Sequence, residues 1–420
     1  MSILKKIVGG NQILVENFFY MSILQLFVIL APLITYPYLN SRLGIELFGV
    51  ILSSQMLVGY ASVLIDFGSN KVAAKHVSIN REDKNVLSEI VSSIISVRCV
   101  LFFVVFILYL LVVITIPKYR DYWVLFLLMY GMTLNDVLFP QYYFQGVERM
   151  KMITIIGTVT KLIFILLVFI TVKTADDYLW VPILYTVGFA IGGVIAMYII
   201  FKKDGLSFIM PSKKQMMYYI KDSSAIFATD LLCTIKDRFN YLLVGLYSTM
   251  GNVVIYDLCL KINGLISQPL AICGTVLFPR FSKFHSIKHI KYFMLFSFVI
   301  TMVMVVLVNI FMQEISYFFL KEHVDLSPIR LFSVAPVILS LSTIVSSNVF
   351  VAWGYNKYVF HSIVITTIAY ILSLALFWAT SQLNSIYSFV TVALISYLTE
   401  LLYRLITVKK VFDIERKKQL

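Results

Sequence analysis

Residues 91–116 read VSSIISVRCVLFFVVFILYLLVVITI and carry a single charged side chain, Arg98. A helix needs about 20 mainly apolar residues to cross the hydrocarbon core of a bilayer, and this stretch exceeds that length. Lipid offers the backbone no hydrogen bonds, so a spanning segment satisfies its own peptide groups by forming a helix. The stretch therefore predicts a membrane-spanning helix, and similar stretches recur along the chain.

The composition favours a membrane protein with many spans. Of the 420 residues, 60% are hydrophobic and 14% are charged, whereas a typical soluble domain has about 25% charged residues. The expected fold is an all-α integral membrane protein with about twelve transmembrane helices. The run after Lys5 and Lys6 has full spanning length and no cleavage site behind it, so we expect a retained first helix. The predicted spans are 15–36, 49–67, 91–116, 122–143, 153–172, 179–201, 224–247, 253–276, 292–313, 330–351, 359–380 and 387–407.

Lysine and arginine are unevenly distributed between the connecting segments. If the N-terminus is cytoplasmic and twelve spans alternate, 23 of the 35 basic residues lie on the cytoplasmic side, 6 outside and 6 within spans. Cytoplasmic loops of membrane proteins carry this excess. The pattern predicts that both termini are cytoplasmic. It also explains the net charge of +13 without nucleic-acid binding.

The chain contains a weak internal repeat. At an offset of 207, LNSRLGIELFG (39–49) lies over LYSTMGNVVIY (246–256), and at 208, YYFQGVERMK (142–151) lies over FVAWGYNKYV (350–359), which pairs Gly146 with Gly354. Halves of six spans have the same orientation, so the repeat is expected to be parallel, with a cavity between two bundles. The predicted divisions are an N-terminal bundle (1–205), a cytoplasmic interfacial linker helix (206–222) and a C-terminal bundle (223–420).

Charged residues inside the predicted spans are the candidates for function. A charge at the bilayer centre costs at least about 2.5–3.5 kcal/mol, so it is expected to face a cavity or a partner. Two pairs, Asp257 with Lys261 and Glu400 with Arg404, are four residues apart and can pair on one helix face. The basic set is Arg98, Lys161, Lys236, Arg238, Lys261 and Arg404, and the acidic set is Asp66, Asp136, Asp230, Asp237, Asp257 and Glu400.

The charges of the seventh span favour a functional reading over a structural one. Asp230 and Asp237 are seven residues apart and share a helix face, which predicts that the seventh span lines an aqueous cavity. Lys161 has no acid within four residues, so it needs a partner from another helix or an anionic ligand. For Arg98, the alternative is a side chain that extends to the membrane surface.

The sequence offers no signature of a metal, redox or nucleotide site. Cys99, Cys233, Cys259 and Cys273 lie in apolar stretches without a CxxC pair, and the five histidines form no ligand motif. There is also no GxxxxGK[ST] loop to hold ATP. We therefore expect a protein that is not an enzyme and that has no cofactor.

Three segments resemble bacterial polysaccharide flippases of the Wzx type, members of the multidrug/oligosaccharidyl-lipid/polysaccharide exporter superfamily. They are APLITYPYLNSRLGIELFG (31–49), QYYFQGVERMKMI (141–153) and KDRFNYLLVGLYSTMGNVVIYDLCLKI (236–262). The resemblance implies a transporter of the bacterial inner membrane. It would move undecaprenyl-pyrophosphate-linked oligosaccharides, such as O-antigen repeat units, from the cytoplasmic to the periplasmic leaflet by alternating access. It also implies coupling to a gradient of H⁺ or Na⁺ and partners among the polysaccharide-assembly proteins.

The resemblance further suggests roles for the charged residues. Lys161, Lys236, Arg238, Lys261 and Arg98 would meet the substrate's phosphates, and Asp230, Asp237, Asp257 and Asp136 would carry the coupling ion. Two alternatives stay open. A membrane-embedded polymerase or ligase needs catalytic residues on a sizeable outer loop, and the longest expected outer connection is only 313–330. A multidrug antiporter should have a carboxylate-rich lobe and fewer buried cations.

Overall fold

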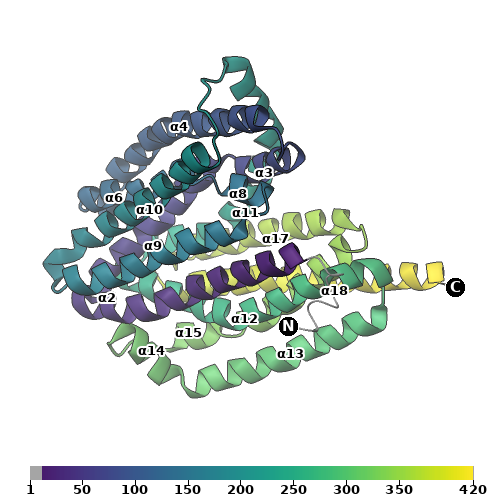
Figure 1. The fold of residues 1–420 in the computed structure, drawn as a ribbon. Helices are drawn as coiled ribbons and strands as arrows, with labels where there is room; N and C mark the ends of the chain where they lie inside the picture. Colours follow the sequence, from purple (N-terminus) through teal and green to yellow (C-terminus); the bar gives the residue numbers. More distant parts are fainter. Residues whose placement is uncertain (1–11, 420) are drawn as a thin grey trace. The chain divides into compact units, whose positions relative to one another are not determined.

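The structure, a computed structural model, describes residues 12–419, and over this range the chain forms helices joined by turns, with no strand. Contacts between Cα atoms divide the chain into two compact units, residues 1–242 and residues 243–420. Helices of each unit can be followed by colour and label in Figure 1.

The first unit contains most of the short helical segments. Its elements are α2 (Gln12–Asp66), α3 (Ser69–Ile79), α4 (Lys84–Thr115), α5 (Pro117–Arg120), α6 (Trp123–Tyr130), η1 (Gly131–Thr133), α7 (Leu134–Leu138), α8 (Gln141–Gly146), α9 (Met150–Thr171), η2 (Ala175–Leu179), α10 (Trp180–Tyr198), the π-helix η3 (Ile199–Lys203) and most of α11 (Lys213–Tyr247). The Asp83 side chain caps α4 by accepting from the backbone N–H groups of Asn85 and Val86. The helix ends just before Pro117, whose ring disfavours a helical conformation for Ile116.

The α2 helix carries two of the predicted spans. It is interrupted only at Gly44, where φ is 76° and ψ is 161°. A residue with a side chain adopts this left-handed φ reluctantly, so glycine allows the chain to bend between the two limbs. The predicted turn between 36 and 49 is therefore a local kink and not a loop.

The core of the first unit lies where α4, α8, α9 and α10 meet. Tyr142, Tyr143 and Phe144 of α8 are buried there against apolar side chains from the other helices. The α9 helix packs against both α2 and α10, and these three labelled helices run side by side in Figure 1. This packing positions the polar side chains of α7, α8 and α9 described below.

The second unit has longer uninterrupted helices. Its elements are α12 (Met250–Phe284), α13 (Ile287–Ile310), α14 (Met312–Leu320), α15 (Ser327–Phe332), α16 (Ala335–Thr343), the π-helix η4 (Ile344–Val351), α17 (Asn356–Ala379) and α18 (Ile386–Gln419). The α16 helix packs against α12, α13 and α18, and α17 packs along α18. Phe281, Phe293 and Trp353 belong to a core cluster formed by α12, α13, η4 and α18.

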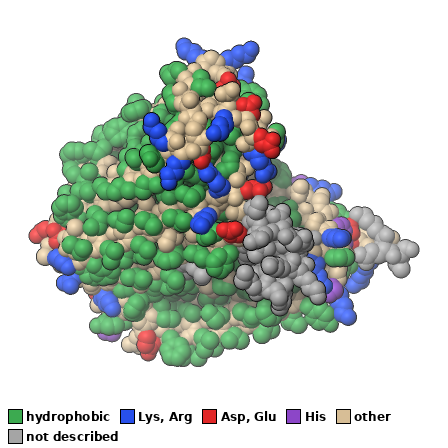
Figure 2. Space-filling view, viewed as in Figure 1, with side chains coloured by type: hydrophobic (Ala, Val, Ile, Leu, Met, Phe, Trp, Pro, Cys, Tyr) green, Lys and Arg blue, Asp and Glu red, His purple; other side chains and the backbone are tan. Residues whose placement is uncertain are grey.

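The surface of both units is apolar. Phe103 on α4 and Leu372 and Trp378 on α17 are each at least 65% exposed, an arrangement that water would oppose and lipid accepts. Hydrophobic side chains cover most of the face seen in Figure 2. Nine helices of the described residues are long and apolar enough to cross a membrane.

The expected all-α integral membrane fold is thus confirmed. Among the nine, α2 counts once although it carries two predicted spans, and α11 and α12 are not included. Both helices carry charged residues within the spans predicted for them. The number twelve remains a prediction.

The two units contain matching turns. After α8, the Arg149 N–H donates to the Phe144 carbonyl at 2.8 Å, and after η4, the Tyr355 N–H donates to the Phe350 carbonyl at 2.7 Å. The two bonds span the same number of residues and are related by an offset of 206. This agreement in backbone geometry supports the internal repeat.

The matching turns change one detail of the predicted alignment. Gly354 has a φ of 80°, and the residue in the same position of the first turn is Glu148, with a φ of 59°. The sequence alignment had paired Gly354 with Gly146, which instead ends the α8 helix. The sequence alignment matches Gly146 with Gly354 because the two residues are identical. The backbone instead matches Glu148 with Gly354, because both have a left-handed φ.

The segment predicted to link the two bundles, 206–222, lies within the first unit and differs from prediction. Beyond η3 the chain is not helical through 204–212, and the backbone N–H groups of Ser207 and Ile209 donate to the hydroxyls of Ser88 and Ser92 on α4. The α11 helix then runs without interruption from Lys213 to Tyr247. A separate linker helix over 206–222 is therefore wrong, because its second half continues into the seventh predicted span.

Candidate functional site

A cavity of about 200 Å³ in the first unit contains Lys161 and is lined mostly by apolar residues. Lys161 comes from the middle of α9, and Asn135 of α7, Gln141 of α8 and Thr160 of α9 also line the cavity. The helices approach closely because Gly192 of α10 faces Thr160, and a β-carbon at residue 192 would lie 2.8 Å from the Thr160 methyl. The cavity thus joins one cation to amide groups that can bind oxygen atoms.

Lys161 is the one basic residue among those that line this cavity. Its side chain is partly buried, and among the described residues no carboxylate forms an ion pair with it. Because a positive charge within a membrane span is costly, it needs either water or an anion. The arrangement can therefore accept an anionic group.

Arg98 is placed quite differently. It is 1% exposed, and its three guanidinium nitrogens donate to the Asp66 carboxylate, to the Ser69 hydroxyl at 2.9 Å and to the Asp136 carbonyl at 2.7 Å. The Tyr142 ring lies 5.2 Å from its guanidinium carbon. Arg98 joins α2, α3, α4, α7 and α8, so we remove it from the candidate binding residues.

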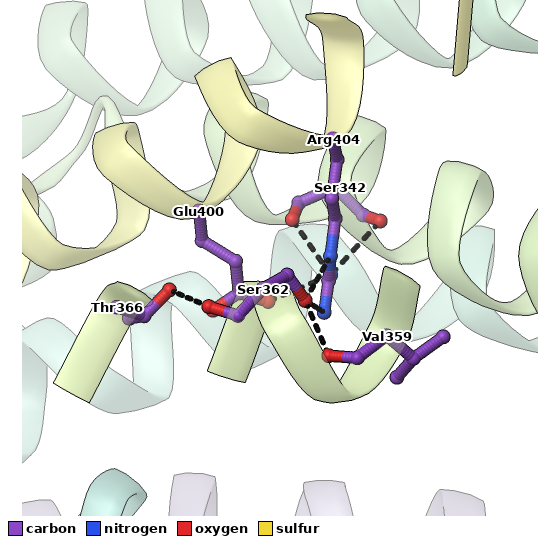
Figure 3. Close-up of polar contacts among 6 residues, drawn as sticks. All are labelled: Ser342, Val359, Ser362, Thr366, Glu400 and Arg404. Atoms are coloured by element: carbon purple, nitrogen blue, oxygen red, sulfur yellow. Dashed lines mark hydrogen bonds and ion pairs between the residues drawn. The ribbon is translucent and has the colours of Figure 1, made fainter. Parts of the chain in front are cut away.

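Arg404 has a similar structural position in the second unit. It forms an ion pair of 2.6 Å with Glu400, one turn away on α18. It also donates to the hydroxyl of Ser342 on α16 at 2.8 Å and to that of Ser362 on α17 (Figure 3). Both charges are almost fully buried. The predicted structural pair is confirmed, and the structure adds the two serines that complete it.

The predicted pair of Asp257 and Lys261 is also present. The two side chains lie 3.1 Å apart on α12 and are both largely buried. Lys261 is therefore partly neutralised by its own helix. It can contribute to an anion site only with a weaker field than Lys161.

Two charged residues of the predicted seventh span contact other helices of the first unit. Asp230 pairs with Lys71 of α3 at 2.6 Å, and the Arg238 guanidinium lies against Gly59 of α2, where any β-carbon would collide with it. The side chains of Lys236 and Asp237 lie outside the described residues. Of the predicted seventh-span set, Asp230 and Arg238 can thus be placed.

Among the candidate acids whose side chains the structure describes, Asp136 forms no ion pair, whereas Asp230 and Asp257 do. Its Oδ2 atom is buried and has no hydrogen-bond partner among the described residues. A buried carboxylate oxygen without a donor is unfavourable when the group is ionised. Asp136 is therefore suited to carry a proton in this conformation.

The neutral polar groups around Lys161 are not among the residues predicted from charge. Asn135 and Gln141 lie on either side of Pro140, where the fourth predicted span breaks into α7 and α8. Polar residues next to a helix break within an apolar span are a readable signal, because irregular backbone at membrane depth usually lines a cavity. The QYYFQG segment used for the family resemblance begins at Gln141.

Comparisons with known proteins agree with this architecture. Residues 14–285 match the family described as "Polysaccharide biosynthesis protein". The Escherichia coli (strain K12) protein named "Putative O-antigen transporter" is 22% identical over 276 residues, which cover 66% of each chain. A Shigella dysenteriae protein of the same name is 26% identical over 285 residues, which cover 64% of this chain and 68% of that one. The chain thus matches about two thirds of the length of these relatives.

Solved structures share the fold at low sequence identity. Lipid II flippase MurJ in an inward closed conformation gives a TM-score of 0.74 at 14% identity, covering 92% of this chain and 87% of that one. An inward-facing multidrug resistance MATE family transporter of the MOP superfamily gives 0.70 at 11% identity, covering 93% and 100%. With the family match spanning well over half of its residues, this chain belongs to the polysaccharide biosynthesis protein family.

Proposed function

We propose that this chain transports lipid-linked oligosaccharides across the bacterial inner membrane. The substrate would be an undecaprenyl-pyrophosphate-linked repeat unit, of O-antigen or a similar polymer, moved from the cytoplasmic to the periplasmic leaflet by alternating access. The observation that carries the proposal is Lys161, a cation without a described carboxylate partner, in a mostly apolar cavity that also holds the Asn135 and Gln141 amides. The family and the names of its relatives support transport of a polysaccharide precursor.

The charges fit a pyrophosphate headgroup better than a cationic drug. Lys161 would bind phosphate oxygens, with the Asn135 and Gln141 amides donating hydrogen bonds to the same group. Arg238, Lys261 and Lys236 are the further basic residues proposed for this role. The polyprenyl tail would stay in lipid between helices, since lipid already keeps it out of water.

Asp136 is the acid we propose for coupling to H⁺. Asp230 and Asp257 already have basic partners, Lys71 and Lys261, whereas the Asp136 Oδ2 atom has none among the described residues. A proton on Asp136 would favour the conformation that buries it, and loss of that proton would favour a state that exposes it to water. Asp237 and coupling to Na⁺ remain the alternatives for this step.

We also propose the membrane, topology and partners of the protein. The chain would cross the inner membrane many times with both termini in the cytoplasm, as the distribution of basic residues predicts. Its partners would be the lipid-linked oligosaccharide, membrane lipid and the proteins that assemble the polymer.

A clean deletion tests the proposal. We expect surface polymer to disappear, with not even one repeat unit on the acceptor, while undecaprenyl-linked units accumulate in the mass spectrum of the lipid extract. A single unit that still reaches the acceptor would mean that export is intact and would point to a polymerase. Unchanged polymer with increased drug sensitivity would point to a multidrug antiporter.

A further inference from the structure

The second unit has its own cavity, of about 390 Å³, between α12 and the α16–η4 segment. None of the residues that line it is charged. Its polar lining consists of hydroxyl and amide side chains: Ser267 and Thr275 of α12, Ser340 and Thr343 of α16, and Ser347 and Asn348 of η4. The cavity therefore differs in kind from the one around Lys161.

The local sequence explains why a cavity forms here. On α12 the lining residues Ala271, Gly274 and Phe278 recur at helical spacing and share one face. Opposite them, the Asn348 amide donates to the Gly274 carbonyl at 2.7 Å and holds η4 against α12. The wider turns of a π-helix displace side chains from the regular helical pattern and often mark functional sites.

Two hydroxyls in the cavity retain their hydrogen-bonding capacity. Ser340 and Thr275 donate to carbonyls of their own helices. Thr343 is exposed and Ser347 is partly buried, and within the described part of the chain neither hydroxyl forms a hydrogen bond or other polar contact. Both hydroxyls are therefore available to a ligand.

A lipid-linked oligosaccharide has three chemically different parts, phosphate, polyprenyl chain and sugar, and the lining of this cavity fits the sugar best. A phosphate would find no counter-ion here, and a polyprenyl chain would leave the Thr343 and Ser347 hydroxyls without partners. A neutral sugar ring offers hydroxyls to pair with these groups, and its C–H face matches the apolar Phe278 and Leu339 side chains. The volume falls within the usual range for small-molecule sites, about 300–1,000 Å³.

We propose that this cavity is a subsite for a neutral sugar residue of the transported glycan. The inference rests on the proposed function, and it adds a group within the second unit, Thr343, Ser347 and Asn348, that would bind uncharged sugar.

Ligand binding to the full chain in lipid nanodiscs tests the subsite. The probes are the repeat-unit oligosaccharide, released by mild acid from the lipid carrier that accumulates in the deletion strain, and inorganic pyrophosphate. The double variant Thr343→Val with Ser347→Ala keeps side-chain volume while removing both hydroxyls. It should bind oligosaccharide about tenfold more weakly and pyrophosphate unchanged, because two hydrogen bonds are lost.

Two further variants make the result specific. Lys161→Gln should show the opposite pattern, with weaker pyrophosphate binding and unchanged oligosaccharide binding. Ala271→Phe should block the cavity and abolish oligosaccharide binding without touching either hydroxyl. The control is Thr367→Val with Thr399→Val, which removes two exposed hydroxyls that bond only to their own helices.

The sugar subsite and the transport proposal are overturned by different experimental results. Oligosaccharide binding by the double hydroxyl variant as tight as wild type overturns the subsite, as does displacement of bound oligosaccharide by decanol, which would identify an alkyl site. No binding of oligosaccharide by the wild-type chain overturns it as well. The transport proposal is tested separately in the deletion strain, where it fails if surface polymer persists or if a single repeat unit still reaches the acceptor.

Discussion

The Arg98 guanidinium on α4 donates a hydrogen bond to the Asp66 carboxylate at the last residue of α2, and Arg98 is 1% exposed. Removing one partner of such a pair leaves a buried charge without compensation, at a cost of about 3–5 kcal/mol. Arg98→Gln should therefore greatly lower the amount of folded protein and its thermal unfolding temperature in detergent. Exposed Arg416→Gln is the control and should change neither. An Arg98→Gln protein that is stable but cannot bind substrate would return Arg98 to the binding site.

Single and double replacements of Arg404 and Glu400 test how strongly the two buried side chains interact. Arg404 keeps its bonds to Ser342 and Ser362 when Glu400 is replaced, whereas Glu400 loses its basic partner when Arg404 is replaced. We expect Arg404→Gln to destabilise the protein more than Glu400→Gln, and the double variant to destabilise it less than the sum of the two. Thermal unfolding of the three variants measures this coupling. Strict additivity would show that the two side chains do not interact.

We predict that residue 354 must be glycine for the turn to form without strain. Its φ of 80° lies in the left-handed region, which costs a residue with a β-carbon about 1–2 kcal/mol. No other atom lies within 4 Å of where that carbon would be, so backbone strain alone should lower the unfolding temperature of Gly354→Ala. Gly264→Ala serves as control, because residue 264 also has open space and lies inside α12, where alanine is favoured. Equal unfolding temperatures for the two variants would contradict the assigned turn.

Much of the fold could be predicted from the sequence. The length of the apolar stretches and the charged residues between them determine where helices cross lipid. All twelve predicted spans fall on helices of the structure, and Asp257 with Lys261 and Glu400 with Arg404 pair at the predicted spacing. These features are local, so residue spacing along one helix is enough to anticipate them.

Features that depend on tertiary contacts were not readable. The sequence placed Arg98 among possible substrate ligands, because its partners Asp66 and Asp136 come from other helices. The cavity near Thr343 and Ser347 was missed because single hydroxyls in apolar spans carry no distinctive spacing. Only the packing of η4 against α12 brings them together with Ser267 and Thr275.

Asp136 is expected to link transport to protons. In proteoliposomes, an imposed proton gradient should accelerate transport by the wild-type chain but not by Asp136→Asn, which cannot exchange a proton. Asp230→Asn is the matched variant, because Asp230 already pairs with Lys71, and it should keep its response to the gradient. A response that follows a Na⁺ gradient in both wild type and Asp136→Asn would contradict a proton role for this residue.

Lys161 carries the central claim, and reconstituted transport tests it most directly. Proteoliposomes loaded with undecaprenyl-pyrophosphate oligosaccharide are assayed for the fraction of substrate that becomes accessible on the opposite leaflet. Wild type and Lys151→Gln, an exposed lysine on the same helix, should transport at similar rates, Lys161→Arg should retain part of the rate, and Lys161→Gln should lose most of it while remaining folded. Transport by Lys161→Gln at the wild-type rate would contradict the account.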